Sequence, residues 1–263
     1  MQNIRQPAVS GSFYPDNPDI LKAMLEGYLQ QVAVTPEDKA PKAMIVPHAG
    51  YIYSGEIAAS AYARLHSRRS TIKRVVLLGP SHRVGFTGLA LSHAEIFKTP
   101  LGDIPLDMKA IASLSNFPFV DYKDQAHLFE HSLEVQLPFL QMTLDSFRLI
   151  PIVAGDCPAE QIEQILELFY DKKDTLIVIS SDLSHFHDYA TAQRLDKETS
   201  KKIEQLDYQH LDYESACGRV PVSGLLALAK KKSLQIETID LRNSGDTAGD
   251  KSRVVGYGAY VIS

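Results

Sequence analysis

Cysteine is scarce in this chain, and long apolar runs and an excess of basic residues are missing. Two cysteines among 263 residues cannot form a disulfide framework, so a reducing compartment is expected. The start of the chain lacks the apolar core of a signal peptide, and the longest apolar runs are strand-sized. We therefore expect a cytoplasmic protein that does not act at a membrane. Acidic residues outnumber basic ones, 32 to 27, which argues against nucleic acid as a partner.

Several motifs of common enzyme classes are also absent. The chain has no GxSxG elbow, which argues against a serine hydrolase of the α/β-hydrolase type. It has no P-loop and no GxGxxG loop opening a helix, which argues against the usual nucleotide and dinucleotide sites. Paired CxxC motifs are missing, which argues against a structural zinc module.

What is present indicates a globular α/β protein. Hydrophobic residues make up 44% of the chain and charged residues 22%. Apolar, β-branched runs that predict buried strands lie at 43–46, 75–78, 149–153, 176–179 and 254–262. Helical patterns lie between them at 20–32, 57–65, 132–140, 159–169, 190–206 and 222–231. This alternation predicts one domain over residues 1–263, with a mainly parallel central sheet and helices on both faces.

Two local signals refine this prediction. Pro151 lies inside an apolar run and cannot donate a backbone hydrogen bond, so it suggests an edge strand or a bulge. Ser54 precedes the alanine-rich pattern at 57–65, and it is a suitable N-cap for that helix.

Polar, chemically active side chains follow three of the predicted strands. His48 comes directly after the first strand, His82 after the second, and Asp182 after the fourth, with His185 and His187 close behind. In open α/β sheets, ligands bind outside the carboxyl ends of the strands. We therefore expect these side chains to meet at one edge of the sheet.

Such a group of imidazoles and a carboxylate allows two kinds of chemistry. With a further carboxylate or thiolate, imidazoles from different strands are typical of a transition-metal site. The same groups could instead act as general acid and base without a metal. A calcium or magnesium site fits less well, because those ions prefer oxygen ligands.

Three further residues are candidates, each with a simpler alternative. Tyr51, beside Gly50, offers a ring and a hydroxyl to a ligand, although this segment could be only a turn at the end of a strand. His131 could be a third nitrogen ligand or a proton carrier, or a residue of a helix's first turn with Glu134 at a capping-box position. Cys217 precedes a helix and an arginine, which favours a thiolate, yet most lone cysteines are simply buried.

The motifs of this chain, taken together and in order, resemble those of the Memo family. They are Pro47-His48-Ala49-Gly50-Tyr51, Gly79-Pro80-Ser81-His82, Glu130-His131-Ser132-Leu133-Glu134, Ser180-Ser181-Asp182 with His185, and Cys217-Gly218-Arg219, preceded by the opening segment 8–15. The resemblance covers nearly the whole chain and includes the prokaryotic AmmeMemoRadiSam system protein B type. It implies a fold similar to that of the class III extradiol dioxygenases, which cleave catechol rings with non-haem iron.

The resemblance also implies a ligand set and a cofactor. His48, His82 and Cys217 would bind the metal, which would be iron or, alternatively, copper. Asp182 and His185 would share the pocket, with His131 near it. The ring-cleaving enzymes use two histidines and a carboxylate, so a thiolate here implies a different redox behaviour.

Two hypotheses about function follow. In the first, the protein is a metal-dependent redox enzyme acting on a small molecule of unknown identity, with His185 as acid or base oriented by Asp182, and Tyr51 contacting the substrate. In the second, suggested by animal Memo proteins, it is a phosphopeptide-binding or adaptor protein that uses a vestigial pocket, aided by Arg83. Prokaryotic relatives are commonly encoded beside a radical SAM enzyme, which implies a partner in a shared pathway.

Overall fold

A large twisted sheet forms the centre of the computed structural model, which describes residues 3–35 and 38–263. Within those residues the strand order is β10 (His185–His187), β12 (Val254–Ile262), β2 (Ala43–Val46), β9 (Thr175–Ser180), β3 (Arg74–Pro80), β8 (Arg148–Ala154), β4 (Leu89–Leu91) and β7 (Val120–Tyr122), and β11 (Glu237–Asn243) also pairs with β12. A small second sheet contains β1 (Ile4–Arg5), β5 (Ile96–Thr99) and β6 (Gly102–Pro105).

The middle of the large sheet is parallel. Strand β9 pairs in parallel with β2 and β3, and β3 pairs in parallel with β8. Every residue of β2 and β9 is buried, as expected for strands covered on both faces. The mainly parallel α/β fold predicted from the sequence is thus confirmed. Strand β12 pairs antiparallel with β2 at one side of this parallel core, and β10 and β11 pair antiparallel with β12.

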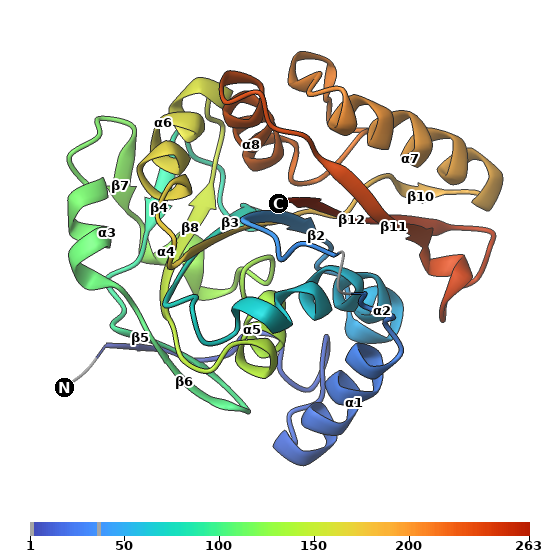
Figure 1. Ribbon diagram of the computed structural model, residues 1–263, viewed down its shortest axis with the longest axis horizontal. Coiled ribbons are helices and arrows are strands. Elements are labelled where there is room, and N and C mark those ends of the chain that lie inside the picture. The colour runs from blue at the N-terminus through green and yellow to red at the C-terminus, as the bar shows by residue number, and fades with distance from the viewer. Residues whose placement is uncertain (1–2, 36–37) are drawn as a thin grey trace.

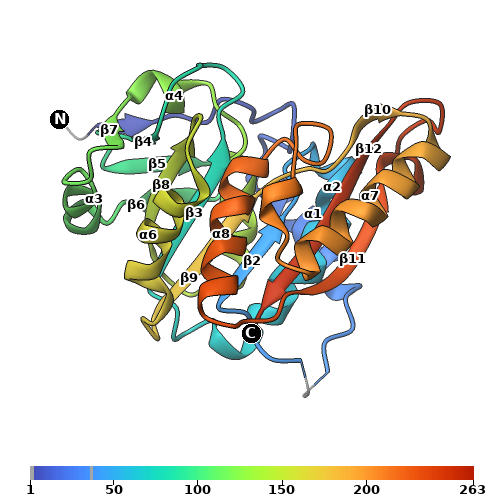
Figure 2. The ribbon, with the colours of Figure 1, turned by 90° about the horizontal axis from the view of Figure 1, so that it is seen from above.

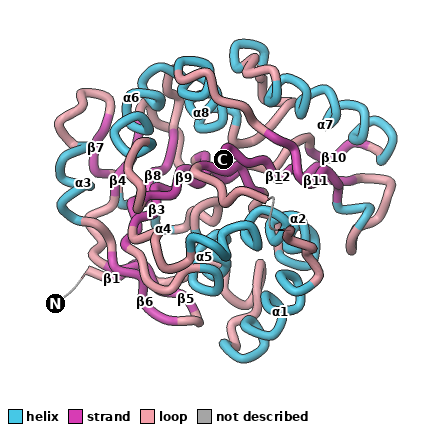
Figure 3. The backbone as a smooth tube through the Cα atoms, viewed as in Figure 1, coloured by secondary structure: helices cyan, strands magenta, loops and turns pink. Residues whose placement is uncertain are grey.

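Helices cover both faces of the sheet (Figures 1 and 2). On one face lie α6 (Ala159–Tyr170), α7 (Tyr189–Glu204) and α8 (Arg219–Lys231). On the other lie α1 (Pro18–Gln30), α2 (Tyr51–Tyr62) and α5 (Leu137–Thr143). The short helices α3 (Met108–Leu114) and α4 (Asp124–Leu128) contact β8 and β4, respectively, at the side of the large sheet that contains β7 (Figures 2 and 3). No helix among the described residues combines the length and apolar character that a membrane crossing needs.

Two helices begin earlier than their sequence patterns indicate. Helix α1 begins at Pro18 rather than at residue 20, because Asn17 caps it by accepting hydrogen bonds from the backbone N–H groups of Asp19 and Ile20. The prediction that Ser54 caps the next helix is wrong, because α2 already begins at Tyr51 and Ser54 lies inside it, donating to the carbonyl of Ala49.

The prediction that Pro151 marks an edge strand is wrong, because β8 is not at the edge of the sheet. Strand β8 lies inside the sheet, between β3 and β4. On the β4 side, however, it pairs only through Val153 and Ala154, with a separate bridge at Leu149. Pro151 falls in the gap between these contacts, so its missing N–H leaves no unpaired partner there.

The N-terminal segment is tied to the loop before α5 through one buried carboxylate. Glu134 is completely buried and accepts hydrogen bonds from Arg5, the backbone N–H groups of Ala8 and Val9, and the hydroxyl of Tyr14. Arg5 also donates to the carbonyl of Glu130 at 2.6 Å. These bonds fix both the N-terminal segment and the loop that carries His131.

Candidate metal centre

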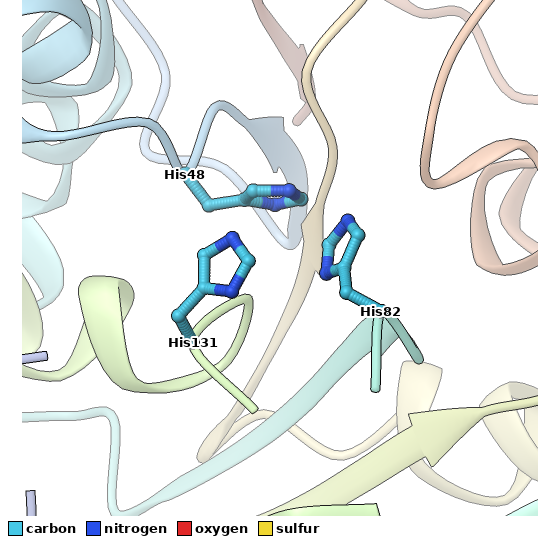
Figure 4. Close-up of side chains that lie close together, drawn as sticks. All are labelled: His48, His82 and His131. Carbon is cyan, nitrogen blue, oxygen red and sulfur yellow. The ribbon is translucent and has the colours of Figure 1, made fainter. Parts of the chain in front are cut away.

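Three histidines from separate segments meet at the carboxyl edge of the parallel strands (Figure 4). His48 follows β2, His82 follows β3, and His131 comes from the loop between α4 and α5. Their ring centroids lie 5.2 Å (His48 to His82), 5.5 Å (His48 to His131) and 4.6 Å (His82 to His131) apart. One ring nitrogen of each lies within 4.8 Å of the others, so the three side chains could hold a metal ion.

The imidazole of His48 is held in one tautomer by Ser180. The Ser180 hydroxyl donates its single proton to the carbonyl of Ser132 at 2.6 Å and accepts a hydrogen bond from the amide of Gln136. Its 2.9 Å contact with His48 Nδ1 must therefore be a hydrogen bond donated by Nδ1–H. This leaves Nε2 of neutral His48 with a free lone pair. Burial lowers the pKa of His48 well below its usual value, which keeps the ring neutral.

His82 is held in the same way by a carboxylate. Glu130 is buried and accepts hydrogen bonds from Nδ1 of His82 at 2.8 Å, from the His82 backbone at 2.6 Å and from the Ser132 backbone at 2.9 Å. Burial alone would raise the pKa of Glu130, but the bonds from His82 and Ser132 outweigh it and lower the pKa to about 2. The ionised carboxylate thus accepts a hydrogen bond from Nδ1–H of His82 and leaves Nε2 of the neutral ring with its lone pair, as in many metal sites.

Cys217 lies beside the histidine group, in the segment that leads into α8. Its Sγ lies 3.3 Å from Nε2 of His48 and accepts a hydrogen bond from the backbone of Asp182. Burial, with the neighbouring Asp182 carboxylate, raises the pKa of the thiol. Without a metal, Cys217 is therefore a thiol that donates to His48 Nε2. A bound metal ion would deprotonate it.

Asp182 and His185 also lie close to the histidine group. The Asp182 carboxylate accepts a hydrogen bond from the His48 backbone at 2.7 Å, and its second oxygen lies 4.0 Å from His48 Nε2. Burial raises the pKa of this carboxyl group. Asp182 and His185 line a common cavity. The expected orientation of His185 by Asp182 stays a prediction, because the structure shows the Asp182 hydrogen bond going to His48.

Tyr51 is buried beneath the site. Its hydroxyl donates to the carbonyl of Val135 at 2.7 Å, and its ring packs against Tyr14 and Phe139. Tyr53, two residues further along α2, lines the cavity. The substrate contact predicted for Tyr51 stays a prediction. The contacts that the Tyr51 side chain makes hold the first turn of α2, which begins at Tyr51, close to His48.

The cavity beside the histidines has a volume of about 410 Å³, within the usual range for small-molecule sites. Its walls include the aromatic rings of Phe13, Tyr53 and Tyr257. Its polar lining includes His131, Asp182, His185 and Arg253. Of the three clustered histidines, His131 lines this cavity, whereas His48 and His82 are not among its lining residues. Larger hollows of about 510 and 780 Å³ lie elsewhere, and none of the three histidines lines them.

Strand β10 brings a second pair of histidines to the rim. The pairing of β10 with β12 is irregular, since His185 lies opposite Val255 and His187 opposite Val254. Phe186 between them has a φ angle of 64°. His185 thereby faces the cavity, while Nε2 of His187 lies 3.7 Å from the exposed carboxylate of Glu214 in the segment before Cys217.

Some residues of the site had no role in the sequence interpretation. Glu130 stands next to His131 in the quoted motif, and Ser180 stands two residues before Asp182, so both were adjacent to recognised candidates. Arg253 carried no signal at all. Its position follows only from the pairing of β10 with β12.

A family model and several known proteins match this chain over nearly its whole length. The family model described as Memo-like protein matches residues 5–261. A MEMO1 family protein of Sulfolobus acidocaldarius is 36% identical over 277 aligned residues, which cover 97% of each chain. MEMO1 family proteins of Sulfurisphaera tokodaii and Aquifex aeolicus are 37% and 35% identical, again over 97% of each chain.

Proposed function

This chain belongs to the Memo-like protein family, and on that premise we propose that it is a metal-dependent redox enzyme that acts on a small molecule. The observation that carries the proposal is the group of His48, His82 and His131, with one ring nitrogen of each within 4.8 Å of the others. Cys217 Sγ lies 3.3 Å from His48 Nε2, and a cavity of small-molecule size adjoins the group at His131. The proposed metal is non-haem iron, with copper as the alternative.

The donor set fits such an ion. His48 and His82 each have Nδ1 engaged by a partner, which leaves the Nε2 lone pair to face an ion, as histidine usually does in metal sites. At His48 this lone pair becomes available once the Cys217 thiol that contacts it loses its proton. Cys217 would add a thiolate, and a set of two imidazoles and one thiolate suits iron or copper better than a hard cation. His131 would supply a third nitrogen or stay free to carry a proton.

When bound, the ion would supply redox chemistry and Lewis acidity to a substrate in the cavity. The chain's own residues would position the substrate and move protons. His185 faces the cavity and would exchange a proton through its imidazole. Asp182, with a pKa raised by burial, would hold a proton at its second oxygen, close to His48. Phe13 and Tyr257 would exclude water from the reacting end.

Iron or copper content of protein purified without oxygen tests the proposal. His48→Ala and Cys217→Ser should each lose most of the metal. His210→Ala serves as the matched control, because His210 is an exposed histidine whose imidazole pairs with Asp207 on its own turn, away from the site. This variant should keep the metal. Unchanged metal content in both site variants would overturn the proposal. Metal-independent binding of a phosphotyrosine peptide would instead support an adaptor role.

His131→Ala separates the two ligand sets. If His131 is a proton carrier, the variant should keep its metal while Cys217→Ser loses it. If the three imidazoles alone bind the ion, the result should be reversed.

A further inference from the structure

Arg253 is a cation at the rim of the cavity that has no anionic partner among the described residues. It lines the cavity next to Val255 and Asp250. Its guanidinium group lies over the ring of Phe186, 4.5 Å from the centroid. In the part of the chain that the structure describes, it forms no ion pair and no side-chain hydrogen bond. Its five N–H donors are thus held by a ring contact and stay available to a ligand.

The Phe186 ring beneath Arg253 is carried by a strained backbone. Phe186 has a φ angle of 64°, a left-handed conformation that costs a bulky residue about 1–2 kcal/mol. The residue is 60% exposed, so hydrophobic burial does not offset this strain. The residue is the extra one in the irregular pairing of His185 and His187 with β12. Bulges of this kind redirect side chains and are frequent beside active sites.

The other charged groups of the cavity do not satisfy Arg253. The Asp250 carboxylate accepts a hydrogen bond from the backbone of Ser252 and so shapes the turn before β12. The Asp182 carboxylate lies deep in the site and is bound to the backbone of His48. The two histidines that line the cavity, His131 and His185, can carry only positive charge and so cannot pair with Arg253. The remaining titratable groups of the described lining are the phenols of Tyr53 and Tyr257, and neither forms a hydrogen bond or a ring contact with Arg253.

From this arrangement we propose that Arg253 determines specificity by binding an anionic group on a planar small-molecule substrate. The substrate's flat part would lie between Phe13, Tyr53 and Tyr257, and its other end would face the histidine group. A guanidinium fork suits a carboxylate or phosphate because it can donate two parallel hydrogen bonds. This inference rests on the proposed function, since it concerns the substrate of the same site.

The test compares two probes of nearly the same shape, one with a carboxylate and one with a neutral carboxamide. We would measure the affinity of 3,4-dihydroxybenzoate and of its neutral amide, 3,4-dihydroxybenzamide, by calorimetry with anaerobic iron-loaded protein and with metal-free protein. The wild type should bind the acid about tenfold more tightly than the amide, in keeping with one charged hydrogen-bonded contact. Added salt should reduce this preference, because the contact lies at an exposed rim.

Variants then locate the preference. Arg253→Ala should bind both probes equally, with unchanged affinity for the amide, and Arg253→Lys should retain part of the preference. Lys251→Ala is the matched control, because it removes the same charge from the same loop while Lys251 contacts Tyr189 rather than the cavity.

The outcomes distinguish this inference from the proposed function. Equal binding of acid and amide by the wild type would overturn the inference, as would a preference that survives Arg253→Ala or a failure of either protein form to bind the acid. A preference in metal-free protein that disappears in Arg253→Ala would support it whether or not iron binds. Loss of iron binding alone would count only against the proposed function.

Discussion

Ser180 Oγ and His48 Nδ1 lie 2.9 Å apart, and the other hydrogen bonds of Ser180 force the histidine to be the donor. The end of β9 thereby sets the tautomer of a ring that follows β2, the neighbouring parallel strand. A residue outside the metal-binding group thus decides which nitrogen of His48 faces the site.

Ser180→Ala should therefore weaken metal binding without unfolding the protein. The variant frees His48 to rotate or to change tautomer, and losses of about 10- to 100-fold in metal affinity are typical when such a partner is removed. Competition with a chelator of known affinity measures the change. Ser184→Ala is the control, because the Ser184 hydroxyl is buried and has no hydrogen-bond partner within the described residues. An equal loss in both variants would contradict the assigned role of Ser180.

Glu130 should make the metal-free protein sensitive to acid. The pKa of its carboxyl group is lowered from 4.5 to about 2 in the folded protein. A lowered pKa gives stability that is fully present above pH 4.5 and is lost as the pH falls through the folded value. The shift corresponds to about 3 kcal/mol of unfolding free energy. Urea denaturation between pH 6 and pH 2 measures it.

The Glu130→Gln variant provides the comparison. It should be less stable than the wild type at pH 6 and should lose less stability on acidification. The difference between the two profiles should be concentrated below pH 4.5, since Asp196, with a pKa raised to about 6, changes protonation at higher pH in both proteins. Parallel profiles would show that Glu130 does not carry the effect.

The sequence could predict the part of the site that depends on strand ends. His48, His82 and Asp182 each follow a buried parallel strand, and parallel strands deliver their carboxyl ends to one edge. Cys217 follows a loop, and no strand places it, so only the family resemblance pointed to it as a ligand. The structure then shows its sulfur 3.3 Å from His48 Nε2.

The rest could not be predicted because it depends on contacts between distant segments. Glu134 occupies a capping-box position in the sequence, yet its carboxylate binds the N-terminal segment, more than 100 residues away. Strands β10 and β11 lack long apolar runs, since their residues are mostly only half-buried. The pairing of β10 with β12 places Phe186 and Arg253 together, and neither residue type alone indicates such a contact.

Glu134→Gln should strongly destabilise the protein. The substitution leaves Arg5, which is also buried, without a charged partner, and breaking one side of a buried ion pair typically costs about 3–5 kcal/mol. Thermal or urea unfolding measures this loss. Glu198→Gln should change stability little, because the Arg194–Glu198 pair is exposed on α7. Similar effects of the two substitutions would contradict the role of the buried pair in fixing the N-terminal segment.

At position 186 a glycine variant should be more stable than an alanine variant. Both Phe186→Gly and Phe186→Ala lose the ring contact with Arg253, so their difference reports only the backbone at a φ angle of 64°. Glycine adopts this conformation without strain, whereas alanine bears a cost of about 1–2 kcal/mol, partly offset by the greater freedom of glycine in the unfolded chain. We expect the glycine variant to be more stable by about 0.5–1 kcal/mol in urea denaturation. At Leu168, inside α6 and 46% exposed, the order should be the opposite. If alanine were the more stable residue at both positions, the left-handed backbone between His185 and His187 would be ruled out.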